Sequence, residues 1–210
     1  MTRIEISGKK YDVPESFDEM TLEQYCKAFF NLSTASEDDD ESLKVRKTIE
    51  NESVILSRIL GESDDFCLNL PVEIYTKMKD RISFVYDIEG FIRNAKAGIT
   101  IDGKRYKIPS HDEMSLRQYI DADMVMNETE NDMQYIELLS VLLSEIGDDG
   151  KPKQYDGKYK EMKDKLTKVK CSDALPLVFH FFKKSVASKT LTEAFMKEGV
   201  TQYHQPTQDS

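Results

Sequence analysis

The side chains that could support acid–base or metal chemistry are few and scattered in this chain of 210 residues. The three histidines are His111, His180 and His204, and none has a cysteine, a histidine or a carboxylate at ligand spacing on the same helical face. A catalytic or metal site needs several such groups brought to one place. The sequence therefore predicts no metal site, and it favours a protein that is not an enzyme.

Two short motifs occur twice and resemble parts of catalytic or phosphate-binding sites. Asp18-Glu19 and Asp112-Glu113 stand just before expected helices, where acidic groups interact favourably with the helix dipole. A glycosidase pair instead needs two carboxyl groups that face each other across a cleft. The Gly-Lys pairs at 8–9 and 103–104 lack the spacing of a phosphate-binding loop. We interpret both motifs as structural and expect no cofactor.

The three cysteines, Cys26, Cys67 and Cys171, are too few and too far apart for a disulfide framework or a zinc site. We expect buried, reduced thiols. The sequence has no apolar run long enough for a membrane span, and its first residues lack a signal-peptide core. We therefore expect a soluble protein made in a cytoplasm.

The composition is that of a globular protein with a net negative charge. Hydrophobic residues make up 39% of the chain, and the formal net charge is −10. An acidic chain is repelled by phosphate backbones, which argues against nucleic acid as a main ligand. The charge is unevenly distributed, since residues 151–170 carry eight lysines against three acidic residues, whereas 37–41 are all acidic.

A repeat organises the chain, with an offset of about 95 residues in its first two segments and 84 in its third. The matching segments are IEISGKKYDVP (4–14) with ITIDGKRYKIP (99–109), DEMTLEQY (18–25) with DEMSLRQY (112–119), and YTKMKDRIS (75–83) with YKEMKDKLT (159–167). A long-period repeat indicates copies of one structural unit. We predict a first unit at residues 1–97, a second unit at 98–188, and a C-terminal helix and polar arm at 189–210.

Each unit is expected to be a β-hairpin followed by about four helices, which gives a helix-dominated α+β fold with a tandem duplication. Alternating residues around a glycine turn predict hairpins at 4–13 and 99–108. The first helix should follow Thr21 or Ser115. In the second unit its apolar residues, at helical spacing, are Leu116, Tyr119, Ile120 and Met124. A β-grasp fold, which also begins with a hairpin and a helix, ranks lower because the next apolar segment is helical in pattern.

The later helices follow from apolar periodicity. A strongly apolar third helix is expected at 54–60, closed by Gly61, and at 135–146, closed by Gly147 in a left-handed cap. A fourth helix is predicted at 74–83 and 159–167. The last helices should include residues 84–92 and 177–182, and 190–198 could form one more.

The two units differ most at their charged segments, and we expect function to lie there. The first unit has an acidic loop (33–42), and the second has a basic segment (151–170). The C-terminal arm is a third difference. The predicted partner-binding residues are Glu37, Asp38, Asp39, Asp40, Glu41, Lys160, Lys163, Lys165, Lys168, Tyr203 and Pro206.

The segments Val13–Tyr25 and Ile108–Tyr119 resemble the opening of small structural and assembly proteins of tailed bacteriophages. The shared pattern is a hydrophobic residue, Pro, two residues, an aromatic residue, Asp-Glu, one residue, Ser or Thr, Leu, one residue, Gln and an aromatic residue. The second segment lacks the aromatic residue found at Phe17. The resemblance implies a tail, neck or baseplate protein, including those of crAss-like phages that infect gut Bacteroides.

Three functional hypotheses follow. The first is a virion ring or connector subunit that binds copies of itself and neighbouring virion proteins, with the acidic loop of one copy meeting the basic segment of the next. The second is a tail-assembly chaperone or adaptor that is absent from the mature virion. The third is an enzyme with an unrecognised site. The first hypothesis places the protein in the virion, after synthesis in the host cytoplasm.

Overall fold

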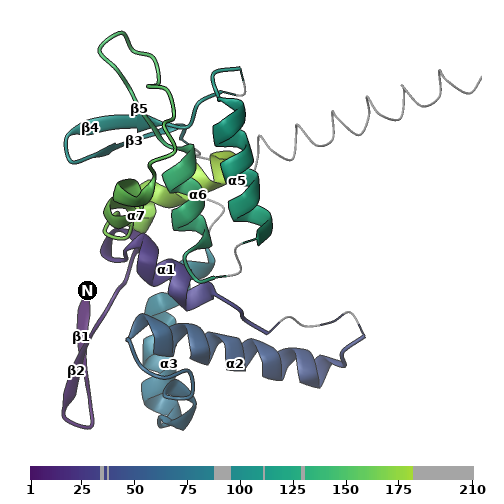
Figure 1. Cartoon of the computed structure of the whole chain (residues 1–210). Coiled ribbons are helices and arrows are strands. Elements are labelled where there is room, and N and C mark those ends of the chain that lie inside the picture. Colours follow the sequence, from purple (N-terminus) through teal and green to yellow (C-terminus); the bar gives the residue numbers. More distant parts are fainter. Residues whose placement is uncertain (34–35, 37, 88–95, 111, 129–130, 182–210) are drawn as a thin grey trace, which may run out of the picture.

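The computed structural model describes residues 1–33, 36, 38–87, 96–110, 112–128 and 131–181, and it is a helix-dominated α+β structure (Figure 1). Each unit begins with an antiparallel hairpin. The strands are β1 (Thr2–Ile6) and β2 (Lys9–Val13) in the first unit, and β3 (Gly98–Ile101) and β4 (Lys104–Lys107) in the second. Both predicted hairpins are confirmed.

The two hairpin turns have the same backbone conformation. The φ angle is 51° at Ser7 and 82° at Gly8, and 50° at Asp102 and 75° at Gly103. Positive φ at both central residues defines a type I′ turn, whose twist matches that of the strands it joins. The glycine in the second central position is required because other residues are strained there.

The strand registers of the two hairpins also agree. Ile4 lies opposite Tyr11 in the first hairpin, and Ile99 lies opposite Tyr106 in the second. These four residues occupy matching positions in the sequence repeat. The repeat therefore corresponds to the same local structure in both places.

In the first unit the described chain continues with η1 (Phe17–Glu19), α1 (Leu22–Phe29), α2 (Glu41–Ile59), η2 (Cys67–Asn69), α3 (Val72–Arg81) and η3 (Ile82–Tyr86), where η denotes a 3₁₀ helix. The predicted start of α1 is confirmed by a capping box. The Gln24 N–H donates to Thr21 Oγ1 at 3.2 Å, and the Thr21 N–H donates to Gln24 Oε1 at 2.9 Å.

In the second unit the elements are α5 (Leu116–Glu128), α6 (Gln134–Leu142), β5 (Ser144–Glu145), α7 (Lys160–Leu166) and a helix at 171–181. Helices α3 and α7 confirm the predicted fourth helices, and the helix at 171–181 begins earlier than expected. The predicted helix at 190–198, the arm and most of the predicted helix at 84–92 lie outside the described residues.

The predicted helix at 135–146 is wrong at its end, because α6 stops at Leu142. The cause is a side chain from α5. Gln118 Nε2 donates to the carbonyl oxygens of Val141 at 2.8 Å and Leu142 at 3.2 Å, so it satisfies groups that would otherwise bond within a longer helix. Gly147 is not among the residues with positive φ, so the predicted left-handed cap there is also wrong.

The residues after α6 extend the second hairpin into a three-stranded sheet in the order β3-β4-β5. Lys107 lies opposite Ser144, and the Ile146 N–H donates to the Arg105 carbonyl at 2.8 Å. Local periodicity suits a helix here, but the free edge of β4 offers unpaired backbone groups that favour a strand.

Helix α2 begins well before the predicted residue Val54. It starts at Glu41, and its N-cap Asp40 accepts a hydrogen bond from the Leu43 N–H at 2.7 Å. The predicted acidic loop is therefore shorter than expected. The C-terminal end of α2 agrees with the prediction, because Gly61 has a φ of 72° and follows the C-cap residue Leu60.

One hydrophobic cluster includes buried residues of both units. Helix α1 lies between α6 and α7 above it and α2 and α3 below it (Figure 1), and it contacts both α2 and α6. The three cysteines are buried and unpaired, as predicted. The described residues contain no helix long and apolar enough to cross a membrane.

Candidate interaction surface

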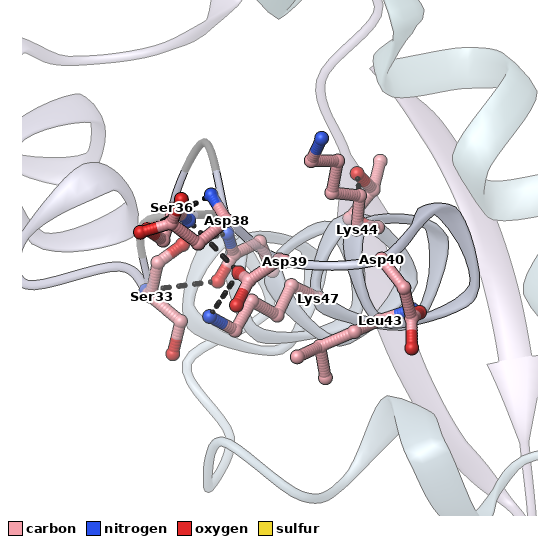
Figure 2. Close-up of polar contacts among 10 residues, drawn as sticks. Ser33, Ser36, Asp38, Asp39, Asp40, Leu43, Lys44 and Lys47 are labelled. Atoms are coloured by element: carbon pink, nitrogen blue, oxygen red, sulfur yellow. Dashed lines mark hydrogen bonds and ion pairs between the residues drawn. The ribbon is translucent and has the colours of Figure 1, made fainter.

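The acidic run before α2 makes contacts with other residues of the same chain (Figure 2). Asp39 Oδ2 accepts a hydrogen bond from the Ser36 N–H at 2.8 Å and lies 2.7 Å from Lys47 Nζ. The bond from Lys47 and that from Ser36 lower the pKa of Asp39. With Asp40 as the N-cap, these contacts order the start of α2.

The remaining residues of the acidic run are more exposed. Asp38 and Glu41 are both exposed, and Glu41 Oε1 lies 3.6 Å from Lys44 Nζ. Glu37 lies outside the described residues. An exposed pair of this kind contributes little to stability. The role of this run in partner binding stays a prediction.

Two of the four predicted lysines are paired with acidic residues of the same chain. Lys163 Nζ lies 2.5 Å from Glu137 Oε1, and Lys165 Nζ lies 3.5 Å from Asp102 Oδ2. Lys160 and Lys168 are exposed. Tyr203 and Pro206 lie outside the described residues. These lysines and the acidic run belong to opposite units, and their pairing between subunits stays a prediction.

The repeated acidic motif links each hairpin to the helix that follows. Glu113 Oε2 accepts hydrogen bonds from the Ser110 N–H at 3.0 Å and from Ser110 Oγ at 2.8 Å, and Glu113 Oε1 lies 2.9 Å from Lys107 Nζ. The bond from the Ser110 backbone, with those from Lys107 and the Ser110 hydroxyl, lowers the pKa of Glu113 to about 2. Glu19 likewise accepts from the Glu15 N–H at 2.9 Å. These carboxylates have a structural role.

Two glutamates that no sequence motif singled out hold the hairpins. Glu62 pairs with Lys9 in the first unit, and Glu145 Oε2 lies 3.0 Å from Lys104 Nζ in the second. Lys9 and Lys104 hold the same position in the repeat. A signal was present, because a buried serine precedes each glutamate by five residues.

An open depression of about 400 Å³ lies beside the second hairpin. Its lining residues are Gly103, Lys104, Arg105, Glu145, Ile146, Gly147, Asp148 and Gly150. Glu145 is held by Lys104 and by Lys153 Nζ at 2.6 Å, and these bonds from Lys153 and Lys104 lower its pKa. A carboxylate stabilised as its anion is a poor general acid. Within the described ranges, no three His, Cys, Asp or Glu side chains form a metal site.

Helix α5 exposes the apolar residues whose helical spacing predicted it. We call this set the α5 face. Its members and exposed fractions are Leu116 (74%), Tyr119 (54%), Ile120 (48%) and Met124 (47%). The buried side of α5 instead consists of Gln118, Ala122 and Val125. Periodicity predicted the helix but not which side packs, because the buried glutamine contributes no hydrophobic signal.

A second exposed apolar surface lies in the first unit. We call it the α2 face, and it consists of Val45 (56% exposed) and Ile49 (46%) on α2 and Tyr86 (46%) on η3. Burial and the nearby Glu52 carboxylate raise the pKa of Tyr86 to about 12. Glu52 follows Ile49 by nearly one helical turn. Tyr86 therefore lies close enough to this part of α2 for its hydroxyl to be influenced by the Glu52 carboxylate.

Comparison with known proteins assigns the chain to no group: no family model matches the sequence, and neither a curated protein nor a solved structure matches it.

Proposed function

We propose that the chain arose as a tandem duplication of one hairpin-and-helix unit. Three kinds of similarity support this proposal: the hairpin registers, the type I′ turns and the clamping glutamates Glu62 and Glu145. The sequence repeat alone would also fit two convergent hairpins. The matched contacts of Glu62 and Glu145 with the two hairpins favour duplication over convergence.

The function that we propose is that of a non-enzymatic structural protein of a tailed-phage virion, a ring or connector-type subunit of the neck or tail. The resemblance of Val13–Tyr25 and Ile108–Tyr119 to phage assembly proteins supports the phage context. Support for a structural role comes from the α5 face, since large apolar side chains grouped on one surface are a feature of protein–protein contacts.

The α5 face is the observation that carries this proposal. Leu116, Ile120 and Met124 recur at four-residue intervals along one side of α5, and each is roughly half exposed or more. Fully burying a leucine, isoleucine or methionine side chain is worth about 1.5–3 kcal/mol. A partner that covers this face would gain much of that energy. The proposed partners are copies of this chain and neighbouring virion proteins.

Quantitative mass spectrometry of purified phage particles tests the proposal. A ring subunit should be present in several copies per particle, in a fixed ratio to other virion proteins. A protein found in infected cells but absent from particles would overturn the virion assignment and favour an assembly chaperone or adaptor. Turnover of a substrate that depends on Glu145 or His111 would instead favour an enzyme.

A further inference from the structure

The matched helices α1 and α5 are packed in opposite ways. Leu22 and Leu116 hold the same position in the repeat, yet Leu22 is fully buried and Leu116 is 74% exposed. About one helical turn further along, Cys26, which is 5% exposed, matches Ile120, which is 48% exposed. The same helical side is therefore covered in the first unit and open in the second.

The second unit covers this side of α1. The Leu22 N–H donates to the Val169 carbonyl at 2.8 Å, and the Cys171 N–H donates to the Met20 carbonyl at 2.9 Å. Thr21 and Lys170 form an antiparallel bridge between these bonds. The covering surface thus includes the chain just before the helix at 171–181.

The α6 region contributes the rest of the covering surface. Helix α1 contacts α6, and burial, with the neighbouring Asp132 carboxylate, raises the pKa of the Cys26 thiol to about 12. Tyr135 lies near Tyr25 and contributes, after burial, to raising the pKa of Tyr25. Residues just before α6 and at its N-terminal end therefore lie near Cys26 and Tyr25.

The first unit has a counterpart of this covering surface. The repeat YTKMKDRIS/YKEMKDKLT, continued by three residues, matches Val85 with Val169 and Tyr86 with Lys170. Aligning the serine–glutamate spacing of α2 and α6 matches Ile49 with Asp132. Of these counterparts, Ile49 and Tyr86 belong to the exposed α2 face, whereas Val85 is buried.

The contact between α1 and the second unit therefore has two matching surfaces elsewhere in the chain, and both are exposed. The α5 face matches the side of α1 that is covered, and the α2 face matches the surface that covers it. By the same matches, Ile120 takes the place of Cys26 and Ile49 takes the place of Asp132, whose carboxylate acts on Cys26. Both isoleucines are exposed, so the two matching surfaces are apolar where they would meet.

We propose that the α5 face of one copy docks on the α2 face of a second copy, in the way that α1 docks on the second unit within the chain. This proposal rests on the proposed function as an assembly subunit and names its partner and its interface. The contact joins different surfaces of the two copies, so it leaves one α5 face and one α2 face open. Such a contact propagates head to tail and closes into a ring where the rotation permits.

Two single substitutions and their mixture test the proposal on the full-length chain. Ile120→Glu alters the α5 face and Ile49→Glu alters the α2 face, and both add the same charge. Val72→Glu, at an apolar position on α3 that is 79% exposed, is the matched control. Thermal unfolding followed by circular dichroism checks that each variant remains folded, and sedimentation velocity gives its mass.

We expect the wild type and Val72→Glu to form oligomers, and each isoleucine variant alone to be monomeric because every contact contains one altered face. Association should weaken by about 30-fold or more, as for a central interface residue. The equimolar mixture should form a one-to-one heterodimer, since an intact α5 face then meets an intact α2 face. This rescue is specific to a contact between different surfaces.

Three results would overturn the proposal. The first is a wild-type chain that stays monomeric at its highest soluble concentration. That result would mean that the α5 face is covered by something other than a second copy, either residues 182–210 or another protein. The second is loss of assembly with Ile120→Glu but not Ile49→Glu, which would indicate an α5–α5 contact. The third is a mixture without heterodimer. The virion assignment is separate, because copy number in particles is measured independently of these masses.

Discussion

The Leu22 N–H donates a 2.8 Å hydrogen bond to the carbonyl oxygen of Val169, so the first helix of the chain is held by the segment before its last described helix. The first N–H groups of a helix have no partner within it, and the second unit supplies one here. Leu116 begins α5 at the matching place in the repeat, but its side chain is exposed. This difference between two matched leucines is the basis of the proposed assembly.

Alanine substitutions at the two matched leucines should have unequal effects on the monomer. Leu22→Ala removes a fully buried side chain, so the free energy of unfolding should fall by about 2–5 kcal/mol. Leu116→Ala alters a mostly exposed side chain and should change it by about 0.5 kcal/mol or less. Urea unfolding at low protein concentration measures both. Equal losses would contradict the burial difference.

The side chain of Gln118 should be important for the stability of the second unit. It is 2% exposed and donates to the last carbonyls of α6. Gln118→Ala leaves those buried acceptors with fewer partners, which should cost about 1–3 kcal/mol. Gln154→Ala, at an exposed position, is the control. A Gln118→Ala variant as stable as the control in urea would show that α6 ends for another reason.

Acid should destabilise the protein in part through Glu113. Its hydrogen bonds lower its pKa from the ordinary value of 4.5 to about 2 in the folded state. The folded state therefore prefers the ionised form, and this stabilisation is complete above about pH 4.5 and disappears as the pH falls through about 2. Glu113→Gln should lower stability at pH 7 and have almost no effect near pH 2. The difference in urea midpoint between variant and wild type, followed from pH 7 to 2, tests this, and a constant difference would contradict it.

The three cysteines should be unreactive in the folded protein. Burial raises the pKa of the thiols of Cys26, Cys67 and Cys171, and the thiolate is the reactive form. A thiol-specific chromogenic reagent at pH 8 should modify none of them rapidly in native buffer and all three in urea. Rapid modification of one thiol in native buffer would show that its surroundings open.

The hairpins and helix starts could be predicted because their signals are local. Gly8 and Gly103 sit in turns that need positive φ, and Thr21 begins a capping box with Gln24. The end of α6 could not be predicted, because it depends on Gln118 from another helix and on the free edge of β4.

The candidate interaction surface was the least predictable part. Periodicity identified Leu116, Ile120 and Met124 as one side of a helix, but a sequence pattern does not say what covers that side. The charged residues were easier to notice, yet Asp39 pairs with Lys47 and Lys163 pairs with Glu137 within the chain. Only the comparison of packing around α1 and α5 shows that one of two matched faces is open.

The mass of the purified full-length chain in solution, measured over a range of concentrations, tests the central claim most directly. We predict a series of oligomers that extends beyond the dimer or ends in a closed ring, because each added copy leaves one α5 face and one α2 face open. A mass of 24.2 kDa at every concentration, or a dimer that grows no further, would contradict it.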